Sequence, residues 1–238
     1  MKESTANNSR LSRQKMQEVA SKRIKEISKE FTNGFKFLED YPKSATFFGA
    51  SQLTEDNKYY KDARILASRL VKELDYSIVS GGGPGIMEAA NRGAFEVGGN
   101  SLGLLIKLPD GQVTNKYITS SIAFYYFFVR KVCLSFSAEA FIFYPGGFGT
   151  SDEFFEILTL IQTKKVKDIP LICVGSEYWN KYKEFMKAEM FSRGTITAKD
   201  FELFHILDNH DEIIKTIKDV PIRADVPLNE DEINTKDE

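Results

Sequence analysis

The sequence has few of the residues that build metal centres and disulfide frameworks. Its two cysteines, Cys133 and Cys173, lie far apart in apolar segments, and its two histidines are His205 and His210. This content excludes a disulfide framework and a cysteine-based zinc module. Two histidines are also too few for a histidine-rich metal site, so we expect no metal and no cofactor.

An excess of positive charge is also absent. The 238 residues include 32 Lys and Arg against 34 Asp and Glu, which gives a net charge of −2. Without a global cationic field, we expect neither nucleic acid nor a membrane surface as a partner. No uncharged apolar run reaches the ~18 residues of a membrane span, and the start, MKESTANNSRLSRQ, lacks the apolar stretch of a signal peptide. These features predict a soluble, cytoplasmic protein.

The charge is unevenly distributed along the chain. Residues 1–30 carry eight Lys and Arg against four Glu, whereas residues 221–238 carry two against six acidic residues. We expect a helical arm over 1–43, a nucleotide-binding domain over 44–220 and an acidic, flexible tail over 221–238, with the first ten residues also poorly ordered. Apolar spacing in the arm predicts one or two amphipathic helices, broken near Asn33-Gly34. The arm could pack on its own domain or on a second subunit.

From Ser44 onward, short apolar runs alternate with helical patterns. Near-continuous apolar strands that alternate with helices are typical of a parallel sheet covered on both faces. The fold class is therefore α/β, a doubly wound, mostly parallel sheet with flanking helices and the helical arm. The predicted strands are 45–49, 77–80, 101–106, 140–144, 171–174 and 203–207. The predicted helices are 58–74, 85–97, 120–136, 151–164, 178–191 and 212–218.

Two glycine-rich loops follow predicted strands and open predicted helices. The first is Ser80-Gly81-Gly82-Gly83-Pro84-Gly85, and the second is Pro145-Gly146-Gly147-Phe148-Gly149-Thr150. Glycine lets backbone N–H groups approach a ligand, and a helix N-terminus adds partial positive charge. One such loop has an even chance of being a plain turn, but two on one sheet favour a phosphorylated ligand.

The common nucleotide and hydrolase fingerprints are missing. There is no G-x-x-x-x-G-K-[ST], which excludes a P-loop NTPase. A G-x-G-x-x-G starting at Gly81 fails because Ile86 takes the last position, and no acidic residue follows the next strand to bind a ribose. There is also no G-x-S-x-G nucleophile elbow.

Three charged residues stand near the second loop and the aromatic segment before it. Thr150-x-x-Glu153 has the spacing of a capping box, and we slightly favour helix capping over catalysis for Glu153 on this pattern alone. Arg130 and Lys131 end the aromatic run 124–129. Most such pairs are solvated, but a cation that emerges from a buried helix is more often placed for a partner such as a phosphate or Glu153.

Together, the segments S-G-G-G-P-G-I-M-E-A-A-N-R-G-A at 80–94, F-F-V-R-K at 127–131 and P-G-G-F-G-T-S-D-E at 145–153 resemble the LOG ("Lonely Guy") family. Members have a Rossmann-like fold and were long mislabelled lysine decarboxylases. The resemblance runs from about Thr46 to Asp211. Glu88, in G-I-M-E, points to the longer bacterial type.

The resemblance implies a phosphoribohydrolase that releases the base from a purine nucleoside 5′-monophosphate, either AMP or an N6-modified, cytokinin-type AMP. It implies a homodimer or larger homo-oligomer. It also places the catalytic pair on two residues and the substrate and phosphate contacts on a further set. The implied catalytic residues are Arg130 and Glu153, and the implied binding residues are Gly49, Ser51, Gly81, Gly82, Gly83, Glu88, Lys131, Gly146, Gly147, Gly149 and Thr150.

Some positions depart from the family pattern, among them Ala50 in the first loop and Tyr144 before the second glycine loop.

We expect Glu153 to ionise readily beside a positive neighbour and to act as a base. Arg130, which stays charged, fixes the substrate. The alternative is a non-catalytic carrier of a nucleotide or of molybdenum cofactor with the same Rossmann-like fold.

Overall fold

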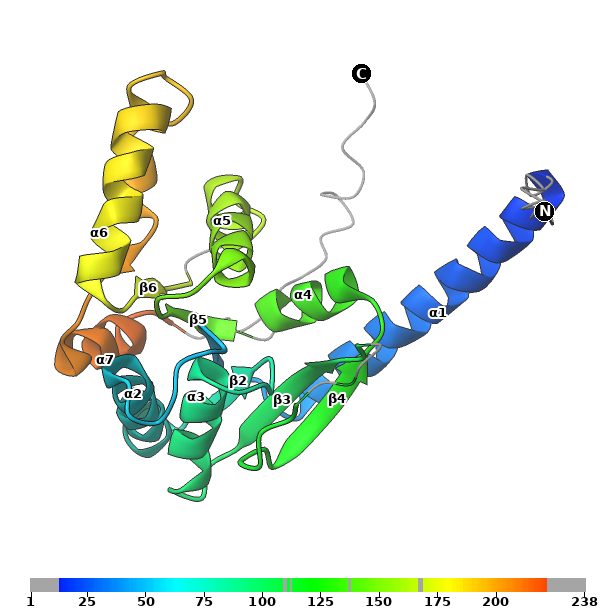
Figure 1. Cartoon of the computed structure of the whole chain (residues 1–238), viewed down its shortest axis with the longest axis horizontal. Helices are drawn as coiled ribbons and strands as arrows, with labels where there is room; N and C mark the ends of the chain where they lie inside the picture. The colour runs from blue at the N-terminus through cyan, green and yellow to red at the C-terminus, as the bar shows by residue number, and fades with distance from the viewer. Residues whose placement is uncertain (1–12, 109–110, 112, 137, 167–168, 222–238) are drawn as a thin grey trace, which may run out of the picture.

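The protein is described by a computed structural model that covers residues 13–108, 111, 113–136, 138–166 and 169–221. The predicted poor order of the first ten residues and of the tail beyond Pro221 lies outside the described residues. The remaining segments form one sheet with helices on both faces and one long helix that extends away from it (Figure 1).

Seven strands of the described chain form the sheet, and every neighbouring pair is parallel. Their order is β4-β3-β2-β1-β5-β6-β7, so the chain moves outward in one direction from β1 and in the other from β5. The doubly wound prediction is confirmed. In such a sheet, ligands bind where the strand order reverses, here between β1 and β5. The strands are β1 (Ser44–Phe48), β2 (Ser77–Ser80), β3 (Ser101–Ile106), β4 (Ser120–Phe124), β5 (Ala138–Phe143), β6 (Leu171–Cys173) and β7 (His205–Ile206).

The helices divide into two layers. One layer packs with the core that contains Phe47, Ile78 and Ile142, and the other with the core that contains Phe48, Phe141 and Trp179. Because neighbouring residues of a strand point to opposite faces, Phe47 and Phe48 contribute to different cores. The first layer holds α2 (Lys58–Leu74), α3 (Ile86–Phe95) and α7 (His210–Lys218); the second holds α1 (Arg13–Glu39), α4 (Phe127–Phe136), α5 (Phe148–Gln162) and α6 (Ser176–Phe185).

Most predicted elements are confirmed to within a few residues, but two predictions are wrong. The helix predicted over 120–136 is a strand, β4, followed by α4, because Ser120 to Phe124 pair in register with β3. The arm is one helix without a break, because Gly34 is buried against Cys133 and Phe124, where a larger side chain would collide. Beyond α6 the chain continues as a π-helical segment, Met186–Phe191, and a short 3-10 helix covers Ala198–Glu202.

Among the described helices, none has both the length and the apolar character needed to cross a bilayer.

Replacing Gly93 tests how closely α2 and α3 pack. A Cβ at Gly93 would lie 2.1 Å from the carbonyl oxygen of Arg64 in α2. Alanine normally favours a helix over glycine, but here the overlap with backbone forces the helices apart. We expect Gly93→Ala to lower the free energy of unfolding by about 1–3 kcal/mol. Gly149→Ala is the control, because its Cβ meets open space. Thermal melts of both variants would contradict the packing if Gly93→Ala melted as high as Gly149→Ala.

Candidate active site

A cavity of about 420 Å³ lies beyond the carboxyl ends of β1, β2 and β5, at the reversal of strand order. Three loops and the helices α3, α4 and α5 surround it, and segments from residue 47 to residue 153 meet there. Its lining comprises Phe47, Phe48, Gly49, Ala50, Ser51, Gly81, Met87, Phe127, Arg130, Lys131, Leu134, Gly147, Phe148, Gly149, Thr150, Asp152 and Glu153.

A buried amide holds the base of the first glycine loop. The side chain of Asn91 in α3 is fully buried and makes the four hydrogen bonds that its oxygen and nitrogen can form. Its Nδ2 donates to Ser101 Oγ (2.9 Å) and to the Leu102 carbonyl oxygen (3.2 Å), while its Oδ1 accepts from Ser80 Oγ at 2.6 Å. A fully satisfied polar network of this kind fixes a single arrangement of the chain.

Asn115 extends this network from the segment between β3 and β4. Its Nδ2 donates to Asn91 Oδ1 (2.9 Å) and to the Gly83 carbonyl oxygen (3.0 Å), and its backbone N–H donates to the Gly82 carbonyl oxygen (3.0 Å). Gly82 itself has φ +73° and donates its N–H to Ser80 Oγ. Only glycine adopts this backbone conformation easily. Gly82 and Gly83 therefore shape the loop and do not line the cavity.

The backbone ties the three loops around the cavity to one another. The N–H of Ile86 donates to the carbonyl oxygen of Ala50, and the N–H of Ala50 donates to that of Pro145, each at 3.0 Å. Gly85 has φ +72°, and a Cβ on it would lie 2.2 Å from the Ala50 carbonyl oxygen. Part of the glycine requirement is thus close packing between loops rather than ligand contact.

The second glycine loop opens α5 earlier than its sequence pattern indicates. The helix starts at Phe148, and its N-cap is Gly147, which has no side-chain capping hydrogen bond. Thr150 and Glu153 therefore lie inside the helix, and the capping-box interpretation of Glu153 is wrong. Space is open at Gly147 and Gly149, and the first N–H groups of a helix have no partner within it. This end of α5 presents an anion-binding geometry to the cavity.

Arg130 reaches the cavity from α4 and is held by backbone carbonyls. Its Nε donates to the Leu104 carbonyl oxygen at 2.6 Å, and its Nη2 donates to the Gly81 carbonyl oxygen at 3.4 Å. A Cβ on Gly81 would lie 2.1 Å from that Nη2, so Gly81 makes room for the guanidinium. Burial lowers the pKa of Arg130, which the nearby Glu153 partly offsets. The group stays charged at neutral pH.

Glu153 is a buried carboxylate in the cavity wall. It is only 9% exposed, and within the described part of the chain its Oε2 has no hydrogen-bond partner. Burial raises the pKa of Glu153 to about 7, against the opposing effect of Lys131; Glu156 adds to the rise and Arg130 opposes it. The expectation that Glu153 ionises readily is wrong, because loss of hydration outweighs both positive neighbours.

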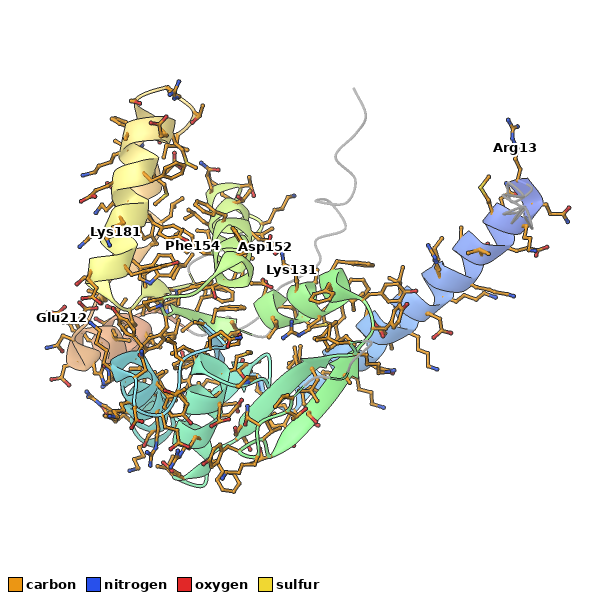
Figure 2. All side chains as sticks on the ribbon, in the orientation of Figure 1. Arg13, Lys131, Asp152, Phe154, Lys181 and Glu212 are labelled. Carbon is orange, nitrogen blue, oxygen red and sulfur yellow. The ribbon has the colours of Figure 1, made fainter. Side chains whose placement is uncertain are left out.

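Lys131 is engaged by two other carboxylates. Its Nζ lies 2.9 Å from Asp152 Oδ2 and also pairs with Glu156, and Figure 2 shows Lys131 of α4 beside Asp152 of α5. Burial disfavours its charged form, but the hydrogen bonds that it donates to Glu156 and Asp152 raise the pKa of Lys131 overall. The two ion pairs of Lys131, with Asp152 and with Glu156, connect α4 to α5 across the mouth of the cavity.

The structure brings most of the predicted site residues together and leaves four outside the lining. Glu88 accepts a hydrogen bond from Tyr60 at 2.8 Å, and Gly146 packs against Thr150, while Gly82 and Gly83 shape their loop. The predicted residues that line the cavity are Arg130, Glu153, Gly49, Ser51, Gly81, Lys131, Gly147, Gly149 and Thr150.

Sequence reasoning missed the apolar wall of the cavity. Met87, Phe127 and Phe148 line it, and Phe148 is 97% exposed. The sequence does contain one signal for this wall: Phe148, a large apolar residue, stands between two glycines of a loop expected to bind a ligand. Tyr144, by contrast, points away from the cavity, because its hydroxyl donates to Asp62 at 2.6 Å.

A smaller hollow of about 190 Å³ lies near the N-terminus of α6. Its charged groups already have partners. Lys58 pairs with Glu177, and the carboxylate of Asp208 accepts from the backbone N–H groups of Gly175 and Ser176. Asp62 accepts from Tyr144 and contacts His210. Among the described residues, no group of three or more His, Cys, Asp and Glu is placed to hold a metal. The larger cavity therefore remains the candidate site.

Known proteins resemble this chain over a region that includes α4 and α5, which carry Arg130 and Glu153. Residues 87–217 match the family described as "Possible lysine decarboxylase". A cytokinin riboside 5′-monophosphate phosphoribohydrolase of Arabidopsis thaliana, LOG5, is 24% identical over 180 residues, which is 75% of this chain and 78% of that protein. An enzyme of the same name from Rhodococcoides fascians is 27% identical over 122 residues, 50% of this chain and 61% of that protein.

Solved structures share the fold at low identity. The molybdenum cofactor binding protein of Rippkaea orientalis superposes with a TM-score of 0.54 at 19% identity, covering 74% of this chain and 93% of that one. The molybdenum cofactor carrier protein of Chlamydomonas reinhardtii gives 0.53 at 19% identity, covering 74% and 96%. Since the family match spans more than half of the chain and the named relatives agree with it, this protein belongs to the LOG family, whose sequence model carries the older lysine decarboxylase description.

Proposed function

We propose that this protein is an N-glycosidic hydrolase that cleaves a purine nucleoside 5′-monophosphate, AMP or an N6-modified AMP, into free base and ribose 5-phosphate. The observation that carries the proposal is Glu153. It is a buried carboxylate with a pKa near neutrality, in a cavity whose loops suit a phosphate. The names of the LOG relatives support the same reaction.

The 5′-phosphate is expected at the start of α5. The first N–H groups of that helix have no partner within the helix, and space is open beside them at Gly147 and Gly149. Thr150 and Ser51 also line the cavity and offer hydroxyl groups. Helix N-termini bind phosphate through N–H groups and the helix dipole, without a metal.

Glu153 is expected to act on the ribose and on water. As the bond from C1′ to the base nitrogen breaks, positive charge develops on the ribose, and an ionised carboxylate in a poorly hydrated wall stabilises it strongly. The same carboxylate takes one proton from the attacking water, whose oxygen bonds to C1′. The departing base nitrogen takes up that proton from Glu153, which returns the carboxylate to its ionised form. The OH of water thus ends on C1′ of the ribose 5-phosphate and its remaining proton on the free base.

Arg130 is expected to position the substrate rather than to donate a proton. Two backbone carbonyls fix its guanidinium, and Arg130 lines the cavity. A guanidinium has five N–H donors, so it can also bind a substrate there. A fixed positive charge there suits the phosphate or the electron-rich leaving base. The apolar wall of Met87, Phe127 and Phe148 offers a stacking surface for the base.

The competing candidate is a carrier that binds a phosphorylated cofactor without cleaving it. The molybdenum cofactor binding and carrier proteins that share the fold raise this alternative. Their identity to this chain supports a common fold only. A carrier has no need for a buried carboxylate with one oxygen that lacks a hydrogen-bond partner among the described residues, whereas a hydrolase uses such a group. Glu153 therefore favours the hydrolase.

The protein is also proposed to work as a homodimer or larger homo-oligomer. Tyr125, Phe127, Phe128 and Phe136 are exposed along α4 and just before it. An exposed aromatic surface of this extent typically belongs to an interface.

Glu153→Gln tests the catalytic carboxylate. The amide keeps the size of the side chain but cannot take a proton from water, so we expect kcat to fall by about 100-fold or more. Free base released from AMP and from isopentenyl-AMP is measured by chromatography. Glu156→Gln, one turn further along α5 and outside the cavity lining, is the control and should keep most of the turnover. Full activity of Glu153→Gln would contradict the proposed role.

The pH dependence follows from the raised pKa of Glu153. The active form is the ionised one, so kcat in the wild type should rise with pH through about 7 and level off above it. A rate profile from pH 5 to pH 9, with buffers matched for ionic strength, measures this. A flat profile across that range would remove Glu153 as the base.

The raised pKa of Glu153 also predicts that the folded protein is less stable at high pH. Because the folded pKa of Glu153, about 7, lies above its ordinary value of 4.5, its ionisation opposes folding increasingly as the pH rises from 4.5. The cost reaches on the order of 3 kcal/mol above pH 7. Glu153→Gln should therefore melt at a higher temperature than the wild type at pH 8. The two should melt alike near pH 4.5, where both side chains are neutral in the folded protein. Thermal melts at the two pH values would contradict the prediction if the difference did not depend on pH.

A further inference from the structure

The outer half of α1 is exposed on every side. All residues from 13 to 26 are exposed, whereas Gly34 and Leu38 near the other end are buried against α4 and its neighbours. Figure 1 shows this half extending beyond the body of the protein, and Figure 2 places Arg13 at its far end. A free helix of this length is only marginally stable in water, about 12–15 residues being the usual minimum. It therefore needs a partner.

The exposed half carries the same apolar stripe as the packed half. At 100° per residue, Met16, Ala20 and Ile24 lie on the face that Ile27, Phe31 and Leu38 continue toward the body. In the packed half, this face covers the core beside α4. In the outer half, Met16 and Ile24 are 51% and 64% exposed. One continuous stripe is thus half covered and half uncovered.

The outer half is also strongly basic. Residues 13–29 contain six Lys and Arg against two Glu. A partner surface for it should therefore be apolar with an acidic border. A basic amphipathic helix can also bind an anionic membrane, so the question is which surface is available.

A groove along α5 has these properties. Its volume is about 780 Å³, and Phe148, Phe155 and Leu160 provide its apolar part. Asp152 and Glu156 border it and outnumber Lys131, the basic residue of its lining. The groove also touches the candidate active site, since Lys131, Phe148 and Asp152 line both.

The arm and the groove of one molecule do not meet. Figure 1 shows α1 extending away from α5, with α4 between them. In Figure 2, Arg13 at the far end of α1 lies well away from Asp152 of α5. Each copy therefore presents both a basic apolar helix and an acidic apolar groove without joining them. Two copies related by a two-fold axis can join both pairs at once.

We propose that the outer half of α1 docks in the α5 groove of a second copy of this chain, so that each copy completes the border of the other's active site. The docked arm covers Phe148, which is otherwise 97% exposed at the cavity mouth. It also brings positive charge next to Asp152 and Glu156. This arrangement deepens the proposed function, because the effect on turnover rests on the hydrolase, whereas the association of the two copies does not.

The double variant Met16→Ser with Ile24→Ser tests the arm. It removes two apolar side chains from the stripe without changing the net charge. Glu18→Ser with Lys25→Ser is the matched control, because it makes two serine substitutions on the opposite face of the same helix, also without a change of net charge. Sedimentation velocity measures the association. We expect a dimer for the wild type and the control, and a dissociation constant raised at least about tenfold for the stripe variant.

A mixed dimer tests whether the arm acts on the other copy. Met16→Ser/Ile24→Ser and Glu153→Gln chains are co-expressed with different tags and purified as the mixed species. The stripe variant keeps Glu153, and the Glu153→Gln copy supplies an intact arm. We expect the stripe variant alone to lose about tenfold in kcat/KM because its cavity stays open to water. The mixed dimer should recover about half of the wild-type activity per dimer, one of its two sites being competent.

Several results would overturn the proposal. A monomeric wild type, or a stripe variant that associates as tightly as the control, would exclude docking of the arm on a second copy. Binding of the monomer to phosphatidylserine vesicles through the stripe would assign the arm to a membrane instead. If the mixed dimer were inactive while the wild type was active, the arm would act on the active site of its own chain and not on that of the second copy. If no nucleotide is cleaved by any form, the hydrolase fails, but sedimentation still decides the association.

Discussion

The reversal of strand order between β1 and β5 is the constraint on which the site depends. Parallel strands end at one edge of the sheet, and the chain leaves β1 and β5 toward opposite sides. A crevice opens there, and the loops after β1, β2 and β5 close around it. Their close backbone contacts, through Ala50 and Gly85, explain why glycine is needed even where no ligand is touched.

Within this crevice, hydration decides the chemistry of the charged groups. Glu153 and Glu156 lie one turn apart on α5, yet Glu156 pairs with Lys131 while Glu153 faces the cavity with one oxygen unpartnered among the described residues. Burial removes hydration that stabilises the ionised carboxylate, and the attraction of Lys131 and Arg130 is too weak to compensate for this loss. The pKa of Glu153 therefore rises to about 7. A carboxylate held this way stores folding free energy that a reaction can use.

In contrast to Glu153, the polar network under the first glycine loop stabilises the fold around the site. Asn91 satisfies all of its hydrogen-bonding groups, and Asn115 ties the segment after β3 to the same loop. The protein therefore combines a rigid, fully paired support with one unpaired group at the cavity wall. Such a division keeps the geometry of a site fixed while leaving its reactive group poised.

The sequence by itself determined the α/β class, most element bounds and the positions of Arg130 and Glu153, because apolar runs and glycine spacing are local patterns. It misassigned 120–124 as helix, since only pairing with β3 selects the strand there. Capping at Glu153, its pKa and the apolar wall at Phe148 were decided by tertiary structure alone. These properties depend on where α5 starts, on how much water the fold excludes, and on which distant segments meet at the cavity.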